Sequence, residues 1–194
     1  VYKRQINHKM THSQTLLPMI DEIFSMVQLK PDDVDVIAVS KGPGSFTGLR
    51  IGAATGKGIA LALDKKMVAV PTLAAMAYNL YGDSRYICPV MDARRKHLYS
   101  GIYTFDGDRL ITVRDVNLES YDELAEELAG LDGQVVLVGD GVDVAGDVLK
   151  EQLGDKCVLA PAHIKTQRAG SVALLAKQLS LIHISEPTRL RRIS

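Results

Sequence analysis

Apolar side chains recur at helical spacing near the start of the chain, and further on they give way to alternating strands and helices. Between residues 11 and 28 they repeat every three or four positions, which predicts a helix. Thr11 and Gln14 have the capping-box pattern of a helix start. Residues 34–40 predict a buried strand, and residues 47–63 predict a second helix after a turn rich in Gly and Pro.

The rest of the chain continues this alternation. Further strands are predicted at residues 67–70, 86–91, 97–105, 109–116, 134–138 and 156–159, and further helices at residues 72–81, 120–129, 142–153 and 169–178. Asp106 and Gly107 indicate a hairpin, and Ser120 with Glu123 forms a second capping-box pattern. Alternating strands and helices indicate an α/β fold. The run of consecutive strands after residue 86 indicates two subdomains, residues 6–84 and 85–178.

The two ends of the chain are related through their DNA. Residues 1–5 can be encoded by GTG TAT AAG AGA CAG, whose reverse complement encodes Leu-Ser-Leu-Ile-His, the sequence of residues 179–183. This relation is typical of one DNA element joined to both ends of a fragment. Residues 1–5 and 179–194 are therefore predicted to be adapter-derived and are excluded from fold reasoning.

Charge and cysteine usage limit the functions open to the chain. The whole chain has 23 basic and 23 acidic residues. Without the predicted adapter segments it has 18 basic and 22 acidic residues, a net charge of −4, which argues against a direct electrostatic grip on RNA. No apolar run of the sequence is long enough to span a bilayer. Cys88 and Cys157 have no CxxC spacing, so neither a zinc site nor a disulfide framework is predicted, which fits a reducing cytoplasm.

The most informative stretch is the turn before the second helix, Gly42-Pro43-Gly44-Ser45-Phe46-Thr47-Gly48-Leu49-Arg50-Ile51-Gly52. Backbone N–H groups of a Gly-rich turn at a helix N-terminus can bind a phosphate. Neither the dinucleotide fingerprint nor the P-loop pattern fits, because the glycine spacing is wrong and the P-loop hydroxyl is missing. A tight turn leading into a closely packed helix is the structural alternative, since glycine also permits close backbone approach.

Four segments together resemble the bacterial TsaB family. They are GPGSFTGLRIG, the helix start His12-Ser13-Gln14-Thr15-Leu16-Leu17-Pro18, the segment Asp92-Ala93-Arg94-Arg95 followed by Tyr99, and the turn Gly139-Asp140-Gly141. They occur in collinear order across residues 6–178, although Gln14 replaces the usual Glu and His97 stands where Glu or Gln is common. The resemblance implies an actin-like, Hsp70-like (ASKHA) fold of two ribonuclease-H-like subdomains. It also implies that the chain is truncated at both ends, lacking a first β-hairpin and a last helical segment.

The resemblance also implies a function. Members of the family are non-catalytic subunits that bind TsaD directly and act with TsaE. The complex forms threonylcarbamoyladenosine at position 37 of ANN-decoding tRNAs. On this basis the protein is expected to be cytoplasmic, with no membrane association and only indirect contact with tRNA. It is expected to form a homodimer when TsaD is absent.

No cofactor is expected on the chain itself, because ATP and a metal ion are expected on the TsaD partner. TsaD holds its metal with a His-x-x-x-His pair, and the matching positions here are Thr72 and Met76. Neither residue is a usual ligand for a hard metal, and Met is soft. No metal ligand and no catalytic residue is therefore assigned.

The two N-terminal helices are predicted to form the partner surface. Apolar residues cover more than one stripe of the first helix, and glycines at every fourth position of the second would permit a close helix approach. The predicted contact residues are Leu16, Ile20, Ile23, Phe24, Val27, Gly48, Gly52 and Gly56. The signature turn is Gly42, Pro43, Gly44, Ser45, Phe46, Thr47 and Arg50, and Asp92 with Arg94 forms a possible site loop. Burial inside the chain and a salt-bridged surface loop are the structural alternatives.

An ATP-binding enzyme, either an ATPase or an acyltransferase in its own right, is the alternative function. The missing histidine pair and the failed P-loop pattern argue against it. A peptidase is a third possibility, but Ser45 is not followed by the x-Gly of a nucleophile elbow, and no nucleophile–base pair is evident. Cys88 lies in an apolar strand and is expected in the core.

Overall fold

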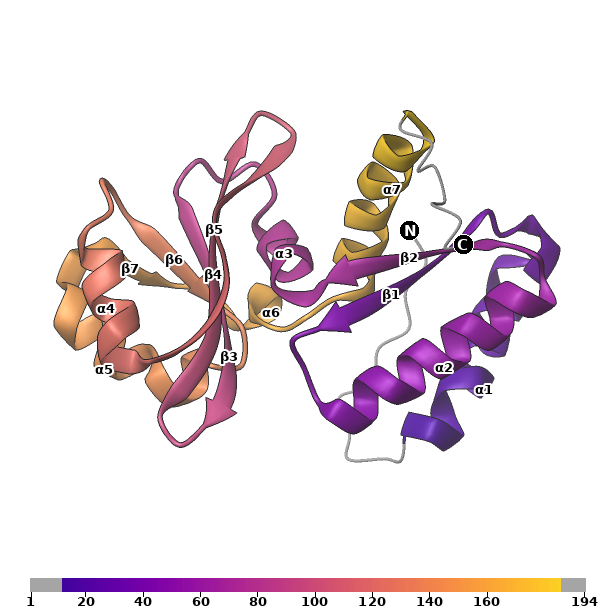
Figure 1. The fold of residues 1–194 in the computed structure, drawn as a ribbon, viewed down its shortest axis with the longest axis horizontal. Helices are drawn as coiled ribbons and strands as arrows, with labels where there is room; N and C mark the ends of the chain where they lie inside the picture. Colours follow the sequence, from indigo (N-terminus) through magenta and orange to yellow (C-terminus); the bar gives the residue numbers. More distant parts are fainter. Residues whose placement is uncertain (1–11, 186–194) are drawn as a thin grey trace, which may run out of the picture.

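Two separate β-sheets organise the molecule, one in each half of the chain (Figure 1). The computed structural model describes residues 12–185. The first sheet is a parallel pair of strands, β1 (Val36–Gly42) and β2 (Lys66–Pro71). The second has five strands in the order β5-β4-β3-β6-β7. The predicted α/β class and the change of topology after the first half of the chain are both present in this architecture.

Two long helices accompany the first sheet. Helix α1 (His12–Val27) leads through the short helix η1 (Pro31–Asp33) to β1, and α2 (Phe46–Ala62) connects β1 to β2. A parallel connection needs such a crossover helix. Helices α1 and α2 lie together on one side of the sheet (Figure 1). The predicted cap residue Thr11 lies outside the described residues.

The second sheet combines a meander with two parallel crossovers. Strands β3 (Tyr86–Arg94), β4 (His97–Asp106) and β5 (Arg109–Ser120) are antiparallel neighbours. The hairpin between β4 and β5 is the one that the turn signal at Gly107 predicts. The chain then passes through α4 (Tyr121–Ala129), β6 (Val135–Val138), α5 (Val142–Leu153), η3 (Gly154–Lys156) and β7 (Cys157–Leu159). Strand β5 is four residues longer than predicted because its pairing with β4 continues to the pair His97 and Ser120.

The remaining helices join the two halves. Helix α3 (Thr72–Ala77) and η2 (Tyr78–Leu80) follow β2, and α6 (Ala162–Lys165) and α7 (Ala169–Ser185) follow β7. Helix α7 returns to the first sheet and packs on the side opposite α2 (Figure 1). It continues without a break through residue 178, and the assignment of residues 179–194 to adapter DNA stays a prediction. None of the described helices is long and apolar enough to cross a membrane.

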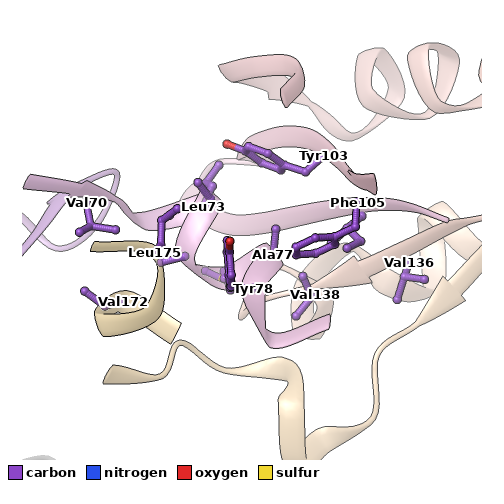
Figure 2. Packing of buried hydrophobic residues seen from close by; sticks show 14 of the residues in the cluster. Val70, Leu73, Ala77, Tyr78, Tyr103, Phe105, Val136, Val138, Val172 and Leu175 are labelled. Carbon is purple, nitrogen blue, oxygen red and sulfur yellow. The ribbon is translucent and has the colours of Figure 1, made fainter. Parts of the chain in front are cut away.

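A buried apolar cluster around α3 lies where the two halves meet. All six residues of α3 are buried. Tyr78 and Phe105 pack edge to face with ring centroids 5.4 Å apart, an arrangement that aromatic pairs favour. Figure 2 shows this cluster, which draws Val70 from β2, Val138 from β6, and Val172 and Leu175 from α7. Contacts between residues far apart in sequence therefore hold the two halves together.

A second apolar cluster lies on the other face of the five-stranded sheet, under α4 and α5. Its members are Cys88, Val90, Leu98, Ile102, Leu124, Ala125, Leu128, Val135, Leu137, Ala145, Leu149 and Cys157. Both cysteines are free and buried, and burial raises the pKa of the Cys88 thiol. Cys88 is therefore a core residue, as its apolar strand predicts.

A polar network with two buried members, Ser100 and Glu119, lies beside this second cluster. Arg114 on β5 donates from Nη2 to Glu119 Oε1 at 2.7 Å and to Ser100 Oγ at 2.9 Å, and it forms an ion pair with Glu127 of α4 at 2.9 Å. Ser100 also donates to Glu119. Buried charges of this kind need paired, hydrogen-bonded partners. Sequence patterns give no sign of this network, because its members come from two strands and a helix.

Candidate functional site

The signature turn is built as the cap of α2. Ser45 is the N-cap residue, and its Oγ accepts a hydrogen bond from the Gly48 N–H at 3.3 Å. The Ser45 carbonyl accepts the Leu49 N–H at 2.8 Å. The Gly42–Pro43 peptide bond is cis, and Gly42 has a φ of +113°, a conformation that favours glycine. Local helix capping therefore already uses one of the N–H groups that a phosphate would need.

Phe46 and Arg50 point outward from the first turns of α2. The Phe46 side chain is 67% exposed, and the Arg50 guanidinium carbon lies 3.7 Å from the ring centroid. This is the geometry of a cation–π pair. An exposed aromatic ring paired with an arginine is a common feature of protein interfaces.

The signature turn also forms one wall of a cleft between the two halves of the molecule. The cleft has a volume of about 700 Å³. Lys41, Gly42, Pro43 and Gly44 contribute from the turn, and Tyr99, Tyr103, Thr112, Asp115 and Val116 contribute from β4 and β5. Burial raises the pKa of Tyr103 to about 12, so its phenol stays protonated at neutral pH. No sequence pattern connects the turn with this strand pair, because the two are more than fifty residues apart along the chain.

A second hollow, the β1 groove, runs along β1 between α1, α2 and α7. Its volume is about 760 Å³, and it is lined by residues 36–40 of β1 and by residues of the three helices. Five of the eight predicted contact residues lie here: Leu16, Ile20, Gly48, Gly52 and Gly56. Among the described residues β1 pairs only with β2, so its other edge has no strand partner. These five residues thus gather beside an open sheet edge, whereas Ile23, Phe24 and Val27 do not line the groove.

The three predicted glycines of α2 have different surroundings. A Cβ on Gly56 would lie 2.5 Å from Val39 Cγ1, so this glycine permits the close approach of α2 to β1. A Cβ on Gly52 would meet no atom within 4 Å. A Cβ on Gly48 would make an ordinary contact with Ser45. The close approach at Gly56 is thus to a strand of the same chain, whereas Gly52 stands open to the groove.

Helix α1 leaves its apolar side chains poorly covered. No residue of α1 from Gln14 onward is buried. The predicted contact residues Ile23, Phe24 and Val27 are half-buried, while Leu17 and Met26 are 55% and 64% exposed. Amphipathic surface helices usually bury one apolar stripe. The α1 surface is therefore a candidate interface, and the identity of its partner is a separate question.

Asp92 and Arg94 lie at the end of β3, where the chain turns sharply. Asp92 Oδ1 accepts the Arg94 backbone N–H at 2.8 Å, and no ion pair among the described residues joins their side chains. Nearby, burial raises the pKa of Asp140, and the charge of Asp92 adds to this effect. The turn around Asp140 packs on β3, since the Gly141 N–H donates to the Val90 carbonyl at 3.1 Å.

Thr72 and Met76, which the family resemblance matches to the TsaD histidine pair, are both only 2% exposed. They lie in α3, where Met76 belongs to the cluster that joins the two halves, and the Thr72 hydroxyl has no hydrogen-bond partner among residues 12–185. Within residues 12–185, no three His, Cys, Asp or Glu side chains lie together as a metal site would require. These two positions are therefore part of the packing between the halves.

Comparison with known proteins assigns the fold and the family. The family model described as "TsaD: tRNA N6-adenosine threonylcarbamoyltransferase" matches residues 7–187. The TsaB protein of Bacillus subtilis (strain 168), a tRNA threonylcarbamoyladenosine biosynthesis protein, is 30% identical over 173 residues, covering 88% of this chain and 74% of its own. The protein of the same name from Escherichia coli (strain K12) is 33% identical over 158 residues, covering 78% and 68%.

A solved structure agrees with this assignment at the level of the fold. YeaZ from Pseudomonas aeruginosa superposes with a TM-score of 0.74 at 24% identity, covering 90% of this chain and 80% of that one. The fold is thus of the actin-like, ribonuclease-H-like class, with two α/β units joined across a cleft. Within that class, the chain belongs to the TsaB (YeaZ) family.

Proposed function

We propose that this chain is a non-catalytic subunit of tRNA threonylcarbamoyladenosine biosynthesis that binds a TsaD-family transferase directly and acts with TsaE. The relatives from Bacillus subtilis and Escherichia coli are both named as tRNA threonylcarbamoyladenosine biosynthesis proteins, which supports a role of this chain in that pathway. On this proposal ATP and a metal ion belong to the TsaD-family partner. The chain itself contributes a binding surface and works in the cytoplasm.

The observation that carries the partner proposal is the uncovered apolar surface of α1. Leu17 and Met26 are exposed, and the other apolar residues of the helix are only half-buried. A further helix packed on α1 and α2 would remove this surface from water at roughly 25 cal/mol for each Å² of apolar area. Leu16, Ile20 and the open position at Gly52 lie beside one another along the β1 groove, where such a helix could approach closely.

The same surface supports a homodimer in the absence of the partner. A two-fold dimer uses one patch on both subunits, so an apolar patch that fits a related subunit can also pair with itself. Homodimer and heterodimer are then mutually exclusive, and the TsaD-family partner displaces one copy of this chain.

The non-catalytic part of the proposal rests on α3. By family resemblance Thr72 and Met76 match the metal-binding histidines of TsaD, and both side chains are buried. Metal catalysis needs ligands that face an open, substrate-accessible position. We therefore expect the isolated protein neither to hydrolyse ATP in a productive cycle nor to modify tRNA. ATP turnover by the isolated protein would favour the alternative of an ATP-binding enzyme.

The test compares two glycines of one helix. Gly52 and Gly58 both have open space where a Cβ would lie, but only Gly52 lines the β1 groove. The test uses the complete protein, and because leucine at either position gains helix propensity, both variants are expected to fold. Gly52→Leu is expected to weaken binding of the TsaD-family partner roughly tenfold or more through overpacking at the junction, while Gly58→Leu retains binding.

The measurement is partner affinity by calorimetry, with a thermal melt of each variant as the folding control. If folded Gly52→Leu binds with wild-type affinity, the helix surface is assigned wrongly. If the wild-type protein itself does not bind the partner, the proposed function is wrong.

A further inference from the structure

The turn between β3 and β4 presents three consecutive positive charges. Arg94, Arg95 and Lys96 are all exposed, and their φ angles are +73°, +53° and +59°. Residues other than glycine rarely adopt this left-handed conformation, and it costs roughly 1–2 kcal/mol for each residue. Three of the five non-glycine residues with positive φ in the described part of the chain lie in this turn. Such strain, where it persists, is a reason to look for a function.

Within residues 12–185, no ion pair neutralises the positive charges of this turn. None of the ion pairs among the described residues includes Arg94, Arg95 or Lys96. The adjacent Asp92 carboxylate bonds to a backbone N–H of the turn and not to the Arg94 guanidinium. The His97 ring bonds to the Arg95 carbonyl, which adds no negative charge. The tight turn thus holds close together three cations that have no ion-pair partner in the described part of the chain.

The net charge of −4, counted without the predicted adapter segments, does not cancel this local field. At physiological ionic strength exposed charges are screened over about 8 Å, so a ligand at the turn responds to the charges beside it. The turn between β3 and β4 and the turn between β1 and α2 lie on the same lower side of the view in Figure 1. The second turn is flanked by two exposed cations, Lys41 and Arg50.

We propose that the β3–β4 turn binds the sugar–phosphate backbone of RNA through Arg94, Arg95 and Lys96. The proposal rests on the proposed function, which brings tRNA to the complex, and it departs from the expectation of purely indirect contact. Guanidinium groups match phosphate oxygens in a two-pronged geometry, and lysine supplies a compact charge. Backbone contacts of this kind set the position of an RNA and do not read its sequence.

The test measures how the affinity for a tRNA transcript depends on salt. The complete protein, in complex with the TsaD-family partner, carries either R94Q/R95Q/K96Q or the control set K66Q/R109Q/K177Q. The control removes the same charge from three exposed positions elsewhere. Each phosphate contact contributes roughly 0.7–0.9 to the slope of log affinity against log salt. The turn variant is expected to lower this slope by about 2–3 and the low-salt affinity roughly tenfold, while the control changes neither.

Partner affinity and thermal melts of the same variants separate the outcomes. A turn variant that keeps the partner and its melting temperature but loses the salt slope supports the proposal. A wild-type slope in the turn variant, an equal loss in the control, or no tRNA binding by the wild-type complex overturns it. Loss of the partner together with tRNA would show that the turn meets an acidic protein surface, which also overturns it. Failure of the proposed function is a separate result, since it appears as a wild-type protein that binds no partner.

Discussion

The two halves of the molecule differ sharply in how much of their apolar surface they bury. From Gln14 to Ala69 only Gly56 and Ala60 are buried. In the second half, by contrast, the cluster under α4 and α5 contains twelve buried residues. The first half has a two-stranded sheet, and the second has five strands covered by helices. Because an isolated strand pair is marginal in water, the first half depends more on what packs against it.

Two helices illustrate the difference. Leu124 and Leu128 of α4 are fully buried against the five-stranded sheet, whereas Leu16 and Ile20 of α1 are half-buried beside the β1 groove. Similar leucine-rich, amphipathic sequences thus reach different burial. The α1 side chains are less buried because α1 packs near a two-stranded sheet with an open edge, whereas α4 packs on a five-stranded sheet. The contrast supports a first half that is completed by further chain or by a partner.

The largest expected effect comes from covering the open edge of β1. The family resemblance implies a β-hairpin before residue 6, and we expect such a hairpin to pair with the open edge of β1. A protein extended by this hairpin should unfold cooperatively, and at a higher temperature than residues 1–194 alone. Residues 1–194 alone should be unstable. Calorimetry of both proteins checks this. The control is an extension of equal length that carries prolines in its strands and so cannot pair with β1. Equal unfolding temperatures with and without the hairpin would contradict the prediction.

The next effect compares truncations to alanine in the two halves. Leu124→Ala should lower the free energy of unfolding by about 2–5 kcal/mol, because the side chain is fully buried and leaves a cavity. Ile20→Ala should cost about 1 kcal/mol, because the side chain is only half-buried. Denaturant unfolding of both variants tests the contrast. If the Ile20 variant loses as much stability as the Leu124 variant, the first half is better packed than the structure indicates.

Sequence patterns predicted the elements well because each depends on local chemistry. The capping box at Ser120 and the hairpin at Gly107 are present as predicted. The two hollows could not be predicted, since each is formed by segments remote in sequence, such as Lys41 and Val116 in the cleft. The glycine spacing on α2 predicted which residues lie beside the groove but not what each of them does. Gly56 permits the close approach of α2 to β1, while a Cβ on Gly52 would meet no described neighbour. Three-dimensional packing distinguishes these roles, and a one-dimensional pattern does not.

Substitutions at two glycines of α2, Gly56 and Gly58, test how closely this helix packs on β1. Gly56→Ala places a methyl group 2.5 Å from Val39 Cγ1, and valine has little rotamer freedom with which to yield. Gly58→Ala meets no neighbour and should be stabilising through helix propensity. The two variants should therefore differ by about 1–3 kcal/mol in the free energy of unfolding. Equal stabilities in thermal denaturation would mean that α2 does not lie close to β1.

The smallest expected effect concerns two serine N-caps, one in each half. Ser45 and Ser120 each accept a backbone N–H three residues later at 3.3 Å. Ser120 is also bonded by Glu123, whose carboxylate accepts the Ser120 backbone N–H and hydroxyl, both at 2.8 Å. Alanine at either serine should cost about 0.5–2 kcal/mol, with Ser45→Ala at the lower end because Gly48 offers no side chain in return.

The pH dependence of these two caps should differ as well. The hydrogen bond from the Ser120 backbone N–H, followed by that from its hydroxyl, lowers the pKa of Glu123 below its ordinary value. A carboxyl with a lowered folded-state pKa stabilises the protein above its unfolded pKa of about 4.3, and this contribution is lost as the pH falls through the folded value. The cost of Ser120→Ala should therefore shrink between pH 7 and pH values well below about 4.3, because the protonated Glu123 has less need of the hydroxyl. The cost of Ser45→Ala, which involves no carboxylate, should stay constant. Unfolding free energies of both variants across this range test the point, and parallel curves for the two would show that Glu123 does not support the Ser120 cap.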